Sequence, residues 1–182
     1  LTVIAMGNNV FRIISSSATR THDKAHILKH LSGDVEFIDI TDNFACLGIF
    51  GPKSRKLMSS ISEDDFSNEN FSFGNGKYIQ INSKKIWAQR LSFVGELGFE
   101  LYIKSKDAEE IYDLLIYEGR NFNLSRCGAH AMDTMRMESG FLHWGHDISP
   151  EENQYQANLQ FAISYKKKFN FIGKKALIKI RN

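Results

Sequence analysis

Proline, cysteine and long apolar runs are all scarce in this chain. Only two of its 182 residues are proline and two are cysteine. Cys46 and Cys127 lie far apart, which excludes a disulfide-rich scaffold and favours reduced, buried thiols in an intracellular protein. No apolar run approaches the roughly 20 residues that a membrane-spanning helix needs. The sequence therefore indicates a protein built around an ordinary hydrophobic core.

Charge of one sign is also lacking. Lys and Arg number 23 against 21 Asp and Glu, so the net charge is +2. This balance offers no basic surface for nucleic acid and predicts no membrane association. The length allows one large domain or two small lobes. Because Leu1 is not Met and opens a strand-like run, we expect an internal fragment of a longer protein.

Residues 1–65 predict a first α+β lobe. Period-two runs predict strands at 1–5, 10–15, 35–40 and 44–50. One helix should begin near Thr21, and a second should have Pro52 at its first position. The expected buried stripes are Ala25, Leu28 and Leu31 in the first helix and Leu57, Met58 and Ile61 in the second. This order resembles a ferredoxin-like split βαβ arrangement.

Residues 66–165 predict a second α+β lobe, and residues 166–182 a connecting tail with a helix near Gly173. Strands are expected at 77–82, 86–93, 99–103 and 159–165. Asp107 and Glu110 form a capping-box pattern before a helix that ends at Gly119. The buried stripe of that helix should be Ile111, Leu114 and Leu115. A further helix is expected at 129–139, followed by an ordered loop at 144–150.

The segment 92–103 is the most informative. Gly95 favours a turn that holds Glu96 at its tip. In the following strand, alternation places Glu100 and Tyr102 on one face and Phe99, Leu101 and Ile103 on the other. A strand carboxylate taken alone is more often an ordinary solvent-facing residue. Beside a phenol, however, a rigidly held carboxylate can accept two adjacent N–H groups, as on a pterin.

Other clusters favour plainer interpretations. His22, His26 and His30 are spaced four apart, but no Asp, Glu or Cys completes a metal set, so a solvated helix face is favoured. The loop containing His143 and His146 is read as a structural corner. Neither cysteine has a histidine nearby in sequence, so thiol catalysis has no support. We predict no metal site.

Arg136 follows Asp133 by three residues and leans toward the apolar stripe of its helix. An arginine there needs a partner, which could be Asp133, Glu138 or a carboxylate near Gly95. An internal ion pair is favoured over direct contact with a ligand.

Five segments in order carry a family resemblance: residues 48–55 (GIFGPKSR), 92–102, 131–138 (AMDTMRME), 144–148 (WGHDI) and 171–177 (FIGKKAL). Together they resemble the aminomethyltransferase family of the glycine-cleavage T-protein. The likeness is strongest to the folate-binding C-terminal half of dimethylglycine and sarcosine dehydrogenases. It covers nearly the whole chain, which looks like the middle of such proteins. The resemblance implies the folate-binding T-protein fold, with the closing C-terminal barrel missing.

The resemblance also implies the ligand contacts. Glu100 matches the carboxylate that reads the pterin, with Leu101 and Tyr102 beside it. Leu1 and Thr2 match contacts near an acidic catalytic residue that would lie just upstream, so no catalytic residue is expected within this chain. Phe93 and Phe161 match aromatic contacts that are often tyrosine. Met132 stands where other T-proteins carry arginine, which disfavours glycine cleavage itself.

The activity implied is one-carbon transfer. In the flavin-linked branch, an N-methyl amine is oxidised, and tetrahydrofolate takes the one-carbon unit and leaves as 5,10-methylene-tetrahydrofolate. The implied cofactors are tetrahydrofolate and, on a domain absent from this chain, FAD. The expected partners are a small N-methyl amine or other one-carbon donor and the flavin domain of the same protein. The expected location is the cytoplasm, or the mitochondrial matrix in a eukaryote.

Three alternatives remain open. One is a stand-alone folate-dependent aminomethyltransferase, or a demethylase acting on a sulfonium or methoxy compound. Another is a non-enzymatic folate-binding factor for iron–sulfur assembly, although the Lys-Gly-Cys-Tyr-x-Gly-Gln-Glu motif of those relatives surrounds neither Cys46 nor Cys127. The last is a plain α+β interaction domain, which would leave the five ordered matches unexplained.

Overall fold

A four-stranded antiparallel sheet organises the first part of the chain. The computed structural model describes residues 1–181 and divides the chain into two compact units, Leu1–Cys127 and Gly128–Asn182. In the first unit the strand order is β3-β6-β5-β4. The strands are β3 (Phe44–Phe50), β4 (Gly76–Ile81), β5 (Lys84–Gln89) and β6 (Gly98–Lys104). The predicted mixed α+β class is confirmed.

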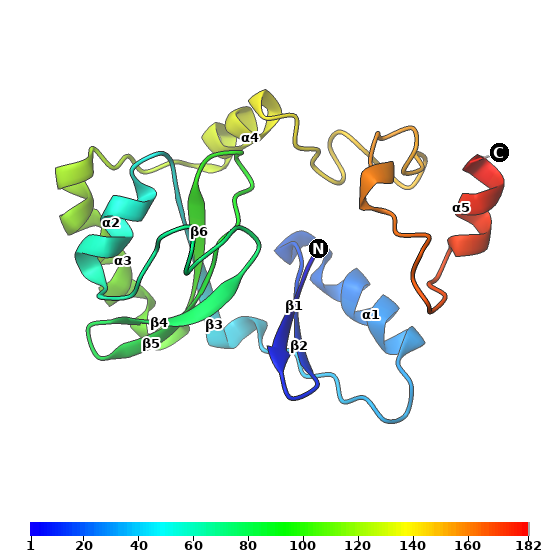
Figure 1. Cartoon of the computed structure of the whole chain (residues 1–182), viewed down its shortest axis with the longest axis horizontal. Helices are drawn as coiled ribbons and strands as arrows, with labels where there is room; N and C mark the ends of the chain where they lie inside the picture. Colours follow the sequence, from blue (N-terminus) through cyan, green and yellow to red (C-terminus); the bar gives the residue numbers. More distant parts are fainter. Residues whose placement is uncertain (182) are drawn as a thin grey trace. The chain divides into compact units, whose positions relative to one another are not determined.

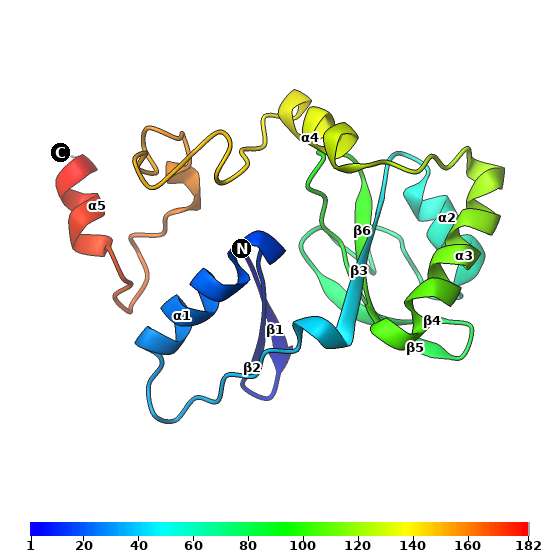
Figure 2. The same ribbon diagram turned by 180° about the vertical axis from the view of Figure 1, so that it is seen from behind.

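Two helices cover one face of this sheet, as Figures 1 and 2 show. They are α2 (Ser54–Ile61) and α3 (Ala108–Gly119). The stripes predicted for α2 and α3 are confirmed, because Leu57, Met58, Ile111 and Leu115 are buried in the main core, and the remaining members, Ile61 and Leu114, pack against it partly buried. The sheet contributes every second residue of β6 to this core, namely Phe99, Leu101 and Ile103. The alternation expected for β6 is therefore correct.

A separate hairpin packs against the other face of the sheet (Figure 1). Its strands are β1 (Thr2–Gly7) and β2 (Val10–Ile14), paired antiparallel. Ile4 of this hairpin forms a small second core with Trp87 and Tyr102. The sheet is thus a middle layer, with helices on one side and the hairpin on the other.

Several local predictions are wrong. Residues 35–40 form no strand, and Val35 and Ile38 are exposed, because no neighbouring strand pairs with this run. Helix α1 (Arg20–His30) exists but buries none of its residues, and Leu28 of its expected stripe remains 48% exposed. Residues 159–165 contain only a short 3-10 turn, Gln160–Ala162, in place of a strand.

Helix starts also differ in detail. Helix α2 begins at Ser54, because Gly51–Lys53 form a turn closed by the Ser54 N–H on the Gly51 carbonyl. The capping box before α3 does not form, since the Asp107 side chain makes no capping bond. Instead, Lys84 lies 3.6 Å from Asp107 and 2.9 Å from Glu110 and pairs with both carboxylates.

The second unit contains α4 (Ala129–Glu138), the turn Gln160–Ala162 and α5 (Lys174–Arg181). The expected helices at 129–139 and near Gly173 are present, and Trp144 and Ile148 are joined by a single β-bridge within the ordered loop. The boundary between the two compact units follows Cys127. The lobes 1–65, 66–165 and 166–182 stay predictions as functional units, although β3 of the first pairs with β6 of the second. No helix among residues 1–181 is long and apolar enough to cross a membrane.

Candidate functional site

Glu100 and Tyr102 form a hydrogen-bonded pair on the face of β6 that points away from α2 and α3. The Tyr102 hydroxyl donates to Oε2 of Glu100 at 2.5 Å. Tyr102 is buried, whereas Glu100 is half-buried. Within residues 1–181 no hydrogen bond reaches Oε1 of Glu100. A positioned carboxylate therefore presents a free oxygen next to a fixed one.

The strand register decides which side chains surround this pair. Glu100 lies opposite Gly48 of β3 and Gln89 of β5. Opposite residues in antiparallel strands share one face of the sheet. Glu100 is thus flanked by a glycine on one side and a buried amide on the other.

Gly48 leaves room for the Phe50 ring beside Glu100. A Cβ at this position would lie 2.5 Å from the Phe50 ring, so a side chain would force that ring to move. Gly48 is itself exposed. The Phe50 ring therefore occupies the place of a side chain at Gly48, beside the carboxylate.

Gln89 supports the opposite side of the pair. Its Oε1 accepts from the Trp87 indole N–H at 3.2 Å, and its Nε2 donates to the Gly74 carbonyl at 2.8 Å. Gln89 and Trp87 are both buried. Because both ends of the amide are bonded, this side of the site is rigid.

Burial and the negative carboxylate keep the neighbouring acids protonated. The pKa of Tyr102 is raised strongly, first by desolvation and then by its hydrogen bond to Glu100. Cys46 lies opposite Tyr102 in β3. Both Cys46 and Cys127 are exposed, so the expected burial of the thiols is wrong, but desolvation of the Cys46 sulfur and the charge of Glu100 raise the pKa of this thiol to about 11. At neutral pH, Tyr102 is thus a donor to Glu100 and Cys46 is a neutral thiol.

Arg12 completes the surroundings of the pair and had no signal in the sequence. Its guanidinium lies over three rings, 5.5 Å from the centroid of Phe44, 5.7 Å from Trp87 and 6.0 Å from Tyr102. Cation–π contacts of this kind fasten the hairpin to the sheet. Only the tertiary contact between β2 and the sheet reveals this role.

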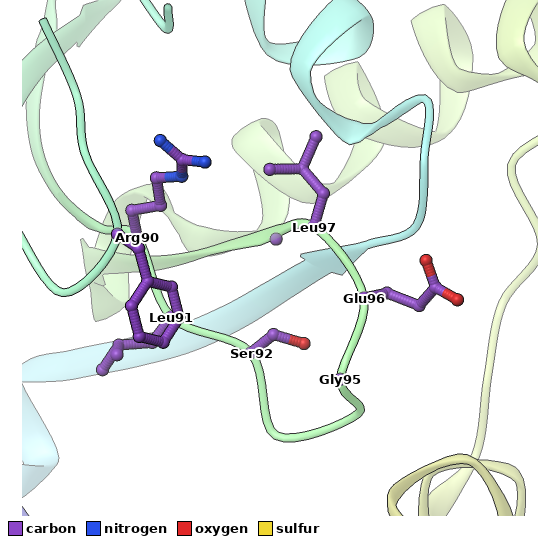
Figure 3. Close-up of a pocket in the computed structure, with 8 residues that line it drawn as sticks. Arg90, Leu91, Ser92, Gly95, Glu96 and Leu97 are labelled. Carbon is purple, nitrogen blue, oxygen red and sulfur yellow. The ribbon is translucent and has the colours of Figure 1, made fainter. Parts of the chain in front are cut away.

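A hollow of about 270 Å³ adjoins the start of β6, and Figure 3 shows its lining. The loop 91–97 forms most of the wall, with Arg90 at one side. Gly95 has a φ of 77°, so glycine permits the turn that carries Glu96. The Leu97 carbonyl fixes the loop to the start of α2, because it accepts from the Gly51 N–H and the Ser54 hydroxyl.

The predicted contacts are placed as follows. Thr2 opens β1 and pairs with Ile14, next to the exposed Leu1. Phe93 lies in the loop between β5 and β6 and is half-buried. The Leu101 side chain points into the core, so only its backbone could face a ligand near Glu100. Phe161 belongs to the second unit and is 83% exposed. The structure therefore brings Glu100 and Tyr102 together, and the other contacts remain predictions.

Arg136 forms the internal ion pair that was favoured for it. It is 2% exposed, and its Nη2 lies 2.6 Å from Oδ1 of Asp133. A second partner, Asp147, was not foreseen; it accepts from Nη1 of Arg136 and from the His143 backbone N–H. The loop after α4 is thus closed onto the helix by its own carboxylate.

The histidines have ordinary surroundings. His22 contacts Asp23 at 3.2 Å, and the rings of His26 and His30 lie 4.8 Å apart. The rings of His143 and His146 stack at 4.4 Å. In the described part of the chain, no three His, Cys, Asp or Glu side chains are arranged to hold a metal ion.

Several known proteins are similar in sequence to this chain over nearly its full length. It is 38% identical over 180 residues to 4-methylaminobutanoate oxidase (formaldehyde-forming) of Paenarthrobacter nicotinovorans, covering 98% of this chain and 22% of that protein. It is 33% identical over 184 residues to human mitochondrial dimethylglycine dehydrogenase, covering all of this chain and 21% of that protein. An aminomethyltransferase of Listeria monocytogenes is 29% identical over 179 residues, 98% of this chain and 48% of that enzyme.

The chain thus spans about a fifth of the length of the oxidase and the dehydrogenase. Residues 1–167 match the GCVT N-terminal domain, which is more than half of the chain. The ordered motifs that resembled the T-protein family are therefore confirmed as a family relationship. This chain belongs to the GCVT N-terminal domain family.

Proposed function

We propose that this chain binds tetrahydrofolate through Glu100 and serves a protein that transfers one-carbon units. The observation that carries the proposal is the Glu100–Tyr102 pair, in which the phenol holds one oxygen of a half-buried carboxylate. The family and the names of the relatives support it, since they include aminomethyltransferases and N-methyl amine dehydrogenases.

The residues present fit a pterin. The Glu100 carboxylate retains an oxygen without a partner and can accept two adjacent N–H donors as a charge-assisted pair. Tyr102 holds the other oxygen, so the carboxylate is oriented before the ligand arrives. The Phe50 ring, which lies over Gly48, can contact a flat ligand bound at this carboxylate. When bound, tetrahydrofolate supplies the nitrogen atoms that accept the one-carbon unit.

We further propose that the whole protein is a flavin-dependent N-methyl amine dehydrogenase that forms 5,10-methylene-tetrahydrofolate. The identities to an oxidase and a dehydrogenase named for N-methylated substrates support this choice. Residues outside this chain would hold the FAD. The N-methyl amine, and contact with a flavin domain of the same protein, belong to the same proposal.

A stand-alone aminomethyltransferase is the second candidate, favoured by the match to nearly half of the Listeria enzyme. The visible absorption spectrum of the purified full-length protein separates the two. A flavin band together with folate binding supports the dehydrogenase. Folate binding without a flavin band supports the transferase.

The test of the folate site is calorimetric titration of tetrahydrofolate into the protein and two variants. Glu100→Gln removes the charge but keeps the shape, and should raise Kd by about ten- to a hundredfold, since a hydrogen bond to a charged group contributes about 1.5–3 kcal/mol. Glu109→Gln changes an exposed residue of α3 and serves as the matched control. Unchanged affinity in a folded Glu100→Gln variant would exclude Glu100 as the pterin contact.

A further inference from the structure

Arg55 and Arg90 carry two positive charges that no carboxylate within residues 1–181 neutralises. Nη2 of Arg55 donates to Oδ1 of Asn68 at 2.7 Å, and Nη1 of Arg90 donates to the Phe71 carbonyl. Both acceptors are neutral. Among residues 1–181 neither arginine forms an ion pair, and Nε of each is buried without an acceptor. Partly buried charges are normally paired, so this arrangement is unusual.

The two guanidinium groups also repel each other electrostatically. They bind the same short stretch of chain, since Asn68 and Phe71 are three residues apart. The pKa of Arg90 is lowered, first by desolvation and then by the positive charge of Arg55. Two like charges held near one another favour an anion between or beside them.

Arg90 borders a space that could hold such an anion. It lines the hollow of about 270 Å³ together with Ser92, Gly95 and Glu96. This volume exceeds the roughly 30 Å³ share of one water several-fold, so a tetrahedral oxyanion would fit. Figure 3 shows the Glu96 carboxylate directed away from the Arg90 guanidinium, so Glu96 does not fill the place of the anion.

The turn that lines this space carries backbone N–H groups without an acceptor in the described part of the chain. Gly95 has a φ of 77°, and the N–H groups of Gly95 and Glu96 donate no hydrogen bond within the described residues. Successive free N–H groups around a left-handed residue commonly hold anions. A guanidinium adds a planar fork that matches the oxygens of a carboxylate or phosphate.

We propose that Arg90, supported by Arg55, forms a binding site for a small oxyanion, a phosphate or carboxylate group, in the hollow beside the loop 91–97. The site is distinct from the Glu100 carboxylate, which would repel an anion and select N–H donors. It does not depend on folate binding.

The test follows the arginine Nε–Hε signals of the ¹⁵N-labelled protein by NMR during titration with inorganic phosphate or succinate. Sodium chloride at matched ionic strength is the reference. We expect the Arg90 and Arg55 signals to shift and saturate with phosphate, with succinate or with both, but not with chloride. The stronger ligand identifies the phosphate or carboxylate class. Shifts no larger than those in chloride would overturn the proposal.

Variants give an independent measure of affinity. Arg90→Gln should raise Kd for the bound anion by about tenfold or more, which corresponds to about 1.4 kcal/mol. Arg90→Lys keeps the positive charge but lacks the planar guanidinium, so its Kd for the anion should lie between those of the wild type and Arg90→Gln. Arg120→Gln, at an exposed arginine, is the control. Wild-type affinity in a folded Arg90→Gln variant would also overturn the proposal. The anion titrations contain no folate, so a failure of this proposal and a failure of the proposed folate site can be told apart.

Discussion

The Tyr102 hydroxyl donates to the Glu100 carboxylate at 2.5 Å, two residues apart on the same face of β6. The bond joins a buried phenol to a half-buried acid. It fixes the direction of the carboxylate without protonating it, because the raised pKa of Tyr102 keeps the proton on the phenol. The orientation of the site is therefore built into one strand.

Removing this bond should weaken folate binding by a limited amount. Tyr102→Phe keeps the ring under Arg12 but frees Oε2 of Glu100. The bond to the charged carboxylate contributes about 1.5–3 kcal/mol to the folded protein, but only the part that orients Glu100 bears on ligand binding, so we expect Kd for tetrahydrofolate to rise about two- to tenfold. Calorimetry on the single variants and on the double variant with Glu100→Gln gives the coupling. Additive effects would show that Tyr102 does not act through Glu100.

The two cysteines should differ in reactivity toward iodoacetamide. Because the pKa of Cys46 is raised from 9.0 to about 11, its thiolate fraction at pH 8 should be about a hundredfold below that of an unperturbed thiol. Mass spectrometry of peptides should show Cys127 alkylated first, and the rate at Cys46 should climb as the pH approaches 11. Bound tetrahydrofolate should slow Cys46 further and leave Cys127 unchanged. Equal rates at pH 8 would contradict the surroundings described for Cys46.

Leu101→Ala should separate stability from binding. The side chain is fully buried in the core beneath α2 and α3. Truncating a buried leucine costs about 2–5 kcal/mol, which urea unfolding would measure. Affinity for tetrahydrofolate in the folded fraction should stay within about twofold of wild type, since the removed atoms lie on the far side of the sheet from Glu100. A large loss of affinity with little loss of stability would place the Leu101 side chain in the site.

The loop after α4 should loosen in acid. Hydrogen bonds from Arg136 lower the pKa of Asp133, and the His143 N–H and Arg136 lower that of Asp147. A lowered pKa in the folded state adds stability above the unfolded value of 3.8, and this stability is lost as the pH falls below it. Amide-exchange protection factors over residues 129–147 should therefore decrease below about pH 4.

Arg136→Met provides the comparison. Without the guanidinium, protection at pH 7 should already be lower, and its acid dependence should shrink to the part due to the His143 N–H. Lys166→Met, at an exposed lysine of the same unit, should behave as wild type. An unaltered pH profile in Arg136→Met would show that the ion pairs do not hold this loop.

Local sequence patterns correctly predicted the features that depend on one helix or strand alone. The stripes of α2 and α3 and the alternation of β6 follow from helix and strand periodicity alone. The runs at 35–40 and 159–165 have strand-like composition but find no strand to pair with, and the stripe of α1 finds no core to cover. Periodicity indicates which residues could be buried, but it contains no information on what would bury them.

By itself, the sequence determined the pair Glu100 and Tyr102, because residues two apart in a strand share a face whatever lies around them. It also determined the family through ordered motifs. Only the tertiary structure decided the rest of the site: Gly48, Gln89 and Cys46 reach the pair through strand register, and Arg12 reaches it through the docking of the hairpin. These contacts join residues far apart along the chain, so they exist only once the sheet has formed.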